Sequence, residues 1–190
     1  METIEIPYHK IEELFYYHPD QLKIKKYIKN LKDKKLRIIF YIVTNSNGIK
    51  TSIKTNLVKK NDNVEKGEFT LQCSCGISSG ESIFLSIFVE DYLQGNGFSI
   101  LLIGTLIGIL NEQKYKFHIK GGMELNNLTI LGIDGDASAG FWDSIGLKEG
   151  RYTYMVYDSK RSELSERSME KSITLNELSK NILNKTFNCT

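Results

Sequence analysis

The sequence contains little cysteine, with three residues among 190. Cys73 and Cys75 alternate in a strand-like run and Cys189 stands far from them, so we interpret all three as reduced, structural thiols. The three histidines are scattered, and no group of histidines and cysteines has the tight spacing of zinc ligands, so we expect no metal site. The odd cysteine count and an N-terminus without an apolar leader favour an intracellular, cytoplasmic and reducing setting.

The sequence also lacks an excess of one charge, because 25 basic and 23 acidic residues leave a net charge of +2. No membrane span is expected, since the apolar run after Gly97 is short and is interrupted by Gly104 and Gly108. The predicted helix at 20–32 is locally basic, and such a run can contact nucleic acid. We favour a solvated helix face and no nucleic-acid partner, because acidic residues elsewhere nearly balance the charge. The lysines of this region are Lys23, Lys25, Lys26, Lys29, Lys32, Lys34 and Lys35.

Hydrophobic periodicity predicts an α/β or α+β domain built around one sheet. We place this domain at residues 1–158, followed by a polar tail at 159–190 that contains a helix at 175–183. The apolar side of that helix would pack on the domain or mediate self-association, which leaves a homodimer open. Strand patterns occur at 3–6, 36–44, 49–58, 68–77, 81–89, 128–133 and 151–158, and helix patterns at 8–17, 20–32, 98–111 and 137–145.

The segment QGNG at 94–97 joins an apolar strand to an uncharged helix. The first N–H groups of a helix have no internal partner and carry the positive end of the helix dipole. Gly95 and Gly97 tolerate positive φ and allow a ligand to approach closely. Together these features predict an anion site suited to a phosphate or pyrophosphate. The dinucleotide fingerprint does not fit, because Ile100 occupies the place of its third glycine, and the Gly-Lys pair of the Walker motif is missing.

Residues 89–99, VEDYLQGNGFS, resemble the acetyl-CoA-binding motif of the GCN5-related N-acetyltransferase (GNAT) superfamily. Gln94, Gly97 and Ser99 match the positions of that motif, and Gly95 matches its common extra glycine. Residues 128–150 resemble the next strand and helix of the family, which end in an aromatic pair, three residues and Gly-Phe. That ending is matched by Phe141, Trp142, Gly146 and Leu147. The two motifs cover about the second half of the chain.

The resemblance implies a mixed, mostly antiparallel central sheet flanked by helices and splayed between the strands around Val89 and Leu128. The first of these strands would carry a bulge near its end, and the pantetheine arm of acetyl-CoA, the co-substrate, would lie in the gap. Backbone groups at the strand end would bond the arm, and the N–H groups from 94 to 99 would hold the pyrophosphate. The implied cofactor-binding residues are Phe88, Val89, Gln94, Gly95, Asn96, Gly97, Phe98, Ser99, Ser138 and Trp142.

The implied reaction is direct attack of an amine on the CoA thioester, assisted by a base that takes the amine proton and an acid that protonates the thiolate. Trp142 stands where the family often has a tyrosine acid, and an indole is not a usable acid. We take Tyr154 as the candidate acid, with Tyr152, Ser138 and water as alternatives.

The family often places its base at positions that Leu85 and Ile83 occupy here, and neither side chain ionises. Glu81 is the one carboxylate of the strand in phase with them, and it is our candidate base. Glu90 and Asp91 are alternatives, whereas the aspartates at 134 and 136 read as turn and helix-cap residues.

We therefore predict an acetyl-CoA-dependent N-acetyltransferase whose acceptor is a primary amine of a small molecule or a protein. The alternative is a catalytically impaired acetyl-CoA-binding module with a regulatory or interaction role, because the usual acid and base positions hold Trp142, Leu85 and Ile83.

Overall fold

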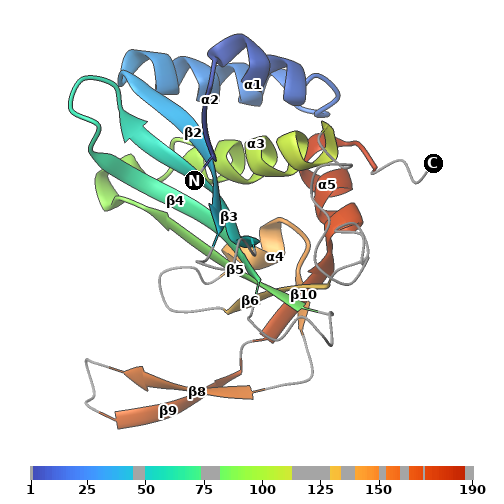
Figure 1. The fold of residues 1–190 in the computed structure, drawn as a ribbon. Helices are drawn as coiled ribbons and strands as arrows, with labels where there is room; N and C mark the ends of the chain where they lie inside the picture. The colour runs from blue at the N-terminus through green and yellow to red at the C-terminus, as the bar shows by residue number, and fades with distance from the viewer. Residues whose placement is uncertain are drawn as a thin grey trace.

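The computed structural model describes residues 2–44, 50–73, 82–112, 129–133, 140–149, 153–158, 163–168 and 170–186. Within these ranges, eight strands form one sheet in the order β1-β2-β3-β4-β5-β6-β10-β7, while β8 and β9 form a separate ribbon (Figure 1). Every neighbouring pair in the large sheet is antiparallel except β5 and β6, which are parallel. The predicted mixed, mostly antiparallel sheet is thus confirmed. The strands are β1 Glu2–Ile6, β2 Leu36–Thr44, β3 Lys50–Lys59, β4 Glu65–Cys73, β5 Ser82–Val89, β6 Thr129–Ile133, β7 Lys148–Glu149, β8 Thr153–Asp158, β9 Glu163–Ser168 and β10 Glu170–Thr174.

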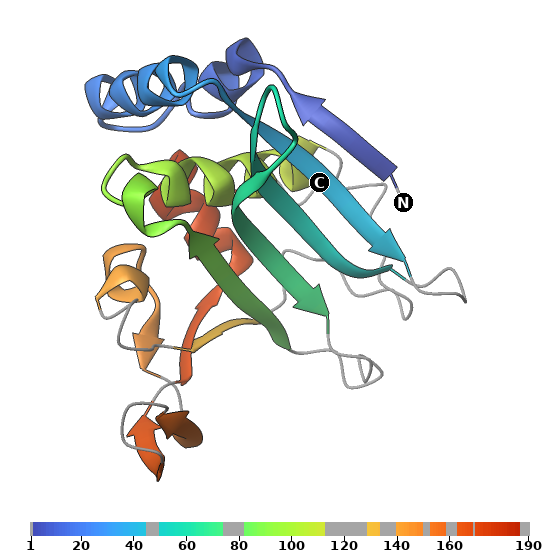
Figure 2. The same cartoon turned by 90° about the vertical axis from the view of Figure 1, so that its left-hand side faces the viewer.

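Helices α1, α2 and α3 lie on the same side of this sheet (Figures 1 and 2). The helix α3 lies directly on the strands, where the Thr55 hydroxyl of β3 donates to the Leu102 carbonyl at 2.9 Å. Because side chains alternate along a strand, the residues in phase with Thr55, such as Ile53 and Leu57, also face α3 and are buried. The helices are α1 Tyr8–Leu14, α2 Gln21–Asp33, the 3₁₀ turn η1 Asp91–Leu93, α3 Phe98–Glu112, α4 Phe141–Ser144 and α5 Leu175–Leu183.

The uncharged helix α3 is the centre of the core. Its residues from Leu101 to Leu110 are all buried, because the sheet lies on one side and α1 and α5 pack on others. Gly104 allows α1 to come close, since a Cβ there would lie 2.1 Å from Cζ of Phe15. None of the helices in the described ranges is both long enough and apolar enough to cross a bilayer.

The strands β5 and β6 start side by side and then separate. They pair in parallel only from Ser82 with Thr129 to Leu85 with Gly132, while β5 stays paired with β4 as far as Val89. Figure 2 shows the two strands diverging from a common end. The last residues of β5 thus have no partner on the β6 side among the described residues, as the predicted splay requires.

The β4–β5 register runs without a shift from Gly67 opposite Val89 to Cys73 opposite Ile83. The bulge expected near the end of β5 is therefore wrong for the described residues. An insertion in β5 would appear as a register shift, and none occurs because each residue from Ile83 to Val89 has one partner on β4. A register shift occurs instead in the neighbouring β3–β4 pair, between Leu57 and Val58 of β3.

The chain after Ser159 contributes to the body of the protein. Strand β10 lies between β6 and β7 in the large sheet, and α5 packs on α3. The helix at 175–183 is confirmed, and Thr174 and Glu177 form a capping box at its start. Sequence pattern alone did not predict β10, because its sequence EKSIT lacks a clear apolar alternation.

The strand predicted at 151–158 forms, but it does not join the central sheet. Among the described residues, strand β8 pairs with β9 alone, in a ribbon that lies apart from the helices and the large sheet (Figure 1). The expectation that all strands share one sheet is therefore wrong. The place beside β6 is taken by β10, which pairs with β6 along its whole length.

Candidate functional site

The glycine corner, defined here as residues 94–97, connects β5 through η1 to α3. Gly95 has φ +76° and Gly97 has φ +81°, both in the left-handed region that favours glycine. The N–H of Leu101 donates to the Gly97 carbonyl at 3.2 Å, so Gly97 is the residue that precedes the first turn of α3. The N–H groups of Phe98, Ser99 and Ile100 thus have no partner within the helix, and no backbone acceptor among the described residues takes them up.

Side-chain amides hold the corner in place. The Gln94 amide donates to the Val89 carbonyl at 3.2 Å and to the Asp91 carboxylate at 3.0 Å. The Asn96 amide donates to the Leu93 carbonyl at 2.9 Å and to the Gln94 carbonyl at 3.2 Å. Both side chains satisfy backbone or carboxylate oxygens around η1, which leaves the backbone N–H groups as the donors that the corner offers to an anion.

Helix α2 forms one wall of the corner, a contact that the sequence did not predict. A Cβ at Gly97 would lie 2.2 Å from Cγ of Tyr27, so the tyrosine ring lies directly against this glycine. The Asn30 amide lies 3.5 Å from the Asn96 carbonyl. The available signal was the helical spacing of residues 23, 27 and 30, which places them on one side of α2.

Alternate residues of β5 direct their backbone groups to opposite sides. The Glu90 N–H donates to the Lys66 carbonyl at 3.0 Å, one residue beyond the last β4–β5 pair. Since hydrogen-bonded and non-hydrogen-bonded pairs alternate in an antiparallel ladder, the backbone of Phe88 is bonded to β4. The backbone groups of Ile87 and Val89 are directed toward β6, and these are the groups that an added strand would meet.

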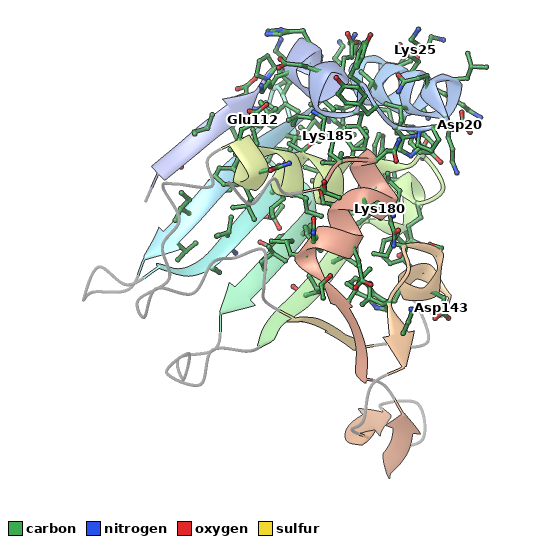
Figure 3. All side chains as sticks on the ribbon, turned by 90° about the vertical axis from the view of Figure 1, so that its right-hand side faces the viewer. Asp20, Lys25, Glu112, Asp143, Lys180 and Lys185 are labelled. Atoms are coloured by element: carbon green, nitrogen blue, oxygen red, sulfur yellow. The ribbon has the colours of Figure 1, made fainter. Side chains whose placement is uncertain are left out.

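Helix α4 holds the second aromatic motif. Leu147 N–H donates to the Trp142 carbonyl at 3.0 Å and Gly146 N–H donates to the Asp143 carbonyl at 3.0 Å, which is a Schellman ending. Gly146, with φ +95°, therefore closes this helix. The Asn181 amide of α5 donates to the Ile145 carbonyl at 3.1 Å, which ties α4 to α5. Figure 3 shows α4, with Asp143 labelled, at the same end of the molecule as Asp20 at the start of α2.

Trp142 is buried, 2% exposed, and its ring meets that of Phe141 edge-on with 5.2 Å between the centroids. The predicted start of this helix, with its cap at 136, lies outside the described residues, as does Ser138. Within the described residues α4 begins at Phe141, after Gly140 in the left-handed conformation.

The predicted proton-transfer groups that lie beside the corner within the described residues are Glu90 and Asp91, and both carboxylates accept hydrogen bonds there. Glu81 lies outside the described residues, and Tyr154 lies on β8 in the separate ribbon. Glu90 is bonded to Lys66 at 3.1 Å. Desolvation raises the pKa of the Glu90 carboxyl, but hydrogen bonds from Lys66 and Tyr92 outweigh it and bring the pKa below its ordinary value. A carboxylate with a lowered pKa is a weak base, so Glu90 is poorly suited to take a proton.

The described residues contain no group of three or more histidine, cysteine, aspartate or glutamate side chains able to hold a metal ion. What this end of the molecule offers is free helix N–H groups, a sheet edge at Ile87 and Val89, and a glycine that admits close approach. These features fit a ligand that has both a phosphate group and an extended chain with amide groups. The pantetheine and pyrophosphate of acetyl-CoA have this combination.

No protein-family model matches the chain, and a search of curated proteins gives no match. The solved structures similar to it include a ribosomal-protein-S5-alanine acetyltransferase from Vibrio fischeri, with 11% identity, 92% of each chain covered and a TM-score of 0.45. A dodecameric spermidine N-acetyltransferase from Vibrio cholerae has 13% identity, 93% of this chain and 94% of that chain covered, and a TM-score of 0.42. AtaTR bound with AcCoA has 12% identity, covers 93% and 94%, and has a TM-score of 0.41. Because every one of these TM-scores is below 0.5, we base the function on the chain's own residues.

Proposed function

We propose that the protein is an N-acetyltransferase that moves an acetyl group from acetyl-CoA to a primary amine of a small molecule or a protein. The observation that carries this proposal is the separation of β5 from β6 immediately before the glycine corner. An extended ligand arm in that gap would lie within reach of helix N–H groups that bind a pyrophosphate. The sequence motif at 89–99 supports the same assignment.

In this proposal the residues at 94–99 hold the pyrophosphate through their N–H groups, and Ile87 and Val89 bond the pantetheine amides. We propose Ile87 in place of Phe88 for this backbone contact, because the alternation of the β4–β5 ladder directs the backbone groups of Phe88 toward β4. Trp142 and Ser138 stay proposed as cofactor-binding residues. Glu81 and Tyr154 stay the proposed base and acid.

The chemistry then depends mainly on position. The amine must reach the thioester carbonyl with its lone pair free, and holding the two groups in an attack geometry contributes several kcal/mol to the rate. An acceptor amine of low pKa needs little help from a base. Such an acceptor suits this site, because the carboxylates of Glu90 and Asp91 already accept hydrogen bonds from Lys66 and Gln94.

The test measures binding and turnover in the same preparation. We expect calorimetry to show binding of acetyl-CoA and CoA, and incubation with a panel of small amines, polyamines and peptides to release free CoA thiol. Gly97→Ala should weaken acetyl-CoA binding at least tenfold, because its methyl group displaces Tyr27 and distorts the start of α3. Absence of acetyl-CoA binding in the unaltered protein would refute the proposal.

A second candidate is a module that binds acetyl-CoA without catalysis. It is favoured by the burial of Trp142 at the usual acid position and by the ion pair that lowers the pKa of Glu90. It predicts binding of acetyl-CoA with no release of thiol for any amine, and no gain of activity in Trp142→Tyr. Turnover with one acceptor of the panel eliminates it.

A further inference from the structure

The basic helix α2 presents one side to the glycine corner. Lys23, Tyr27 and Asn30 recur at the spacing of one helix face, and two of them contact the corner. The Lys23 ammonium lies 6.0 Å from the centre of the Tyr27 ring, whose carbon atoms contact Gly97. The side of α2 that bears Lys23 is therefore next to the free N–H groups of α3.

The lysines of α2 differ in their partners. Lys29 pairs with Asp33 at 3.7 Å, and Lys32 pairs with Glu12 at 2.9 Å. Among the described residues the Lys23 ammonium has no carboxylate within ion-pair distance. Asp20, the acidic residue nearest in sequence, uses its carboxylate to accept the Lys23 backbone N–H at 2.9 Å as the cap of α2. The positive charge of Lys23 is thus available to a ligand.

Lys25 provides the comparison within the same helix. Two residues further along, it lies about 200° around the helix axis from Lys23. Figure 3 shows it at the outer edge of α2, away from α3. Both side chains are exposed lysines in the first two turns of one helix, so they differ mainly in the direction they face.

We propose that Lys23 is part of the co-substrate site and binds the phosphate groups of the CoA nucleotide at the glycine corner, with Tyr27 and Asn30 holding α2 in place. This inference rests on the proposed function and extends it, because it makes the N-terminal basic helix a determinant of co-substrate affinity. It also gives a role to Lys23, one of the lysines that composition alone assigns to a solvated helix face.

The expected effect follows from electrostatics. An ammonium within about one Debye length of two or three phosphate charges contributes roughly a three- to tenfold gain in affinity, and added salt reduces it. A tenfold change corresponds to about 1.4 kcal/mol.

The test compares Lys23→Gln with Lys25→Gln in the full chain. Calorimetry with CoA at low and at physiological salt should show Kd rising about three- to tenfold for Lys23→Gln at low salt, and by less than twofold for Lys25→Gln. Repeating the calorimetry with 3′-dephospho-CoA shows which phosphate Lys23 contacts. If Lys23→Gln no longer raises the Kd, Lys23 contacts the 3′-phosphate. If the Kd still rises, Lys23 contacts the pyrophosphate.

Equal Kd values for the two variants would overturn the role of Lys23 and leave the proposed function standing, provided that the unaltered protein binds CoA. If the unaltered protein binds no CoA, the proposed function and this inference fail together. Unchanged unfolding curves for both variants would exclude a difference in folding as the cause.

Discussion

Gly97→Ala should destabilise the protein more than Gly95→Ala, although the two glycines have nearly the same backbone conformation. Their φ angles are +81° and +76°, and alanine in the left-handed region costs about 1–2 kcal/mol at either position. They differ in surroundings. Nothing lies within 4 Å of a Cβ at Gly95, whereas a Cβ at Gly97 would lie 2.2 Å from the ring of Tyr27.

The extra cost at Gly97 comes from displacing the Tyr27 ring. Forcing a methyl group into a packed site costs about 1–3 kcal/mol, so the free energy of unfolding should fall by about 2–5 kcal/mol for Gly97→Ala and by about 1–2 kcal/mol for Gly95→Ala. Urea unfolding followed by circular dichroism measures both values.

A double-mutant cycle isolates the contact. In a Tyr27→Ala background, Gly97→Ala should cost no more than Gly95→Ala, because only the left-handed backbone term remains. Equal costs for the two glycine variants in the native background would refute the packing of α2 against the corner. A cost at Gly97 that persists without the tyrosine ring would refute it too.

Three further predictions concern stability. Burial raises the pKa of the Glu68 carboxyl, but hydrogen bonds from Lys54 and a threonine outweigh this effect and hold the pKa below its ordinary value of 4.5. Glu68→Gln should therefore lower the free energy of unfolding by about 1 kcal/mol at neutral pH. Urea unfolding at a series of pH values should show this loss disappearing as the pH falls below 4.5 through the lowered pKa. Asn181→Ala removes the bond to the Ile145 carbonyl and should lower the free energy of unfolding by about 1 kcal/mol, whereas Asn181→Asp, which removes the donor but keeps the side-chain shape, should cost at least as much. A chain that ends at residue 169 loses β10 and α5 and should give no cooperative thermal transition; a sharp transition would show that the sheet is stable without them.

The sequence predicted the elements whose signals are local. The strand at 36–44 is rich in β-branched and aromatic residues, and the helix at 175–183 has one apolar side, so the sequence predicts both with their observed bounds. The corner at 94–97 was predicted because two glycines and an uncharged helix start are visible in a short stretch.

The features that sequence did not predict depend on contacts between distant segments. The helical spacing of residues 23, 27 and 30 places them on one side of α2, but it does not indicate that the Tyr27 ring lies against Gly97, 70 residues later. β10 has a polar sequence, so its place in the sheet comes from pairing with β6 along all five of its residues. The base and acid remain predictions, since Glu81 lies outside the described residues and Tyr154 lies on the ribbon.

The position of β10 has a consequence for how the chain folds during synthesis. Strands β1 to β5 and α3 can assemble as soon as they are made, but one edge of β6 has no partner until residues 170–174 have been translated. An unpaired strand edge is a template for association with other chains, and pairing across a long sequence separation is slow. This edge of β6 is therefore open to association with other chains between the synthesis of β6 and that of β10, after β1 to β5 and α3 have been made.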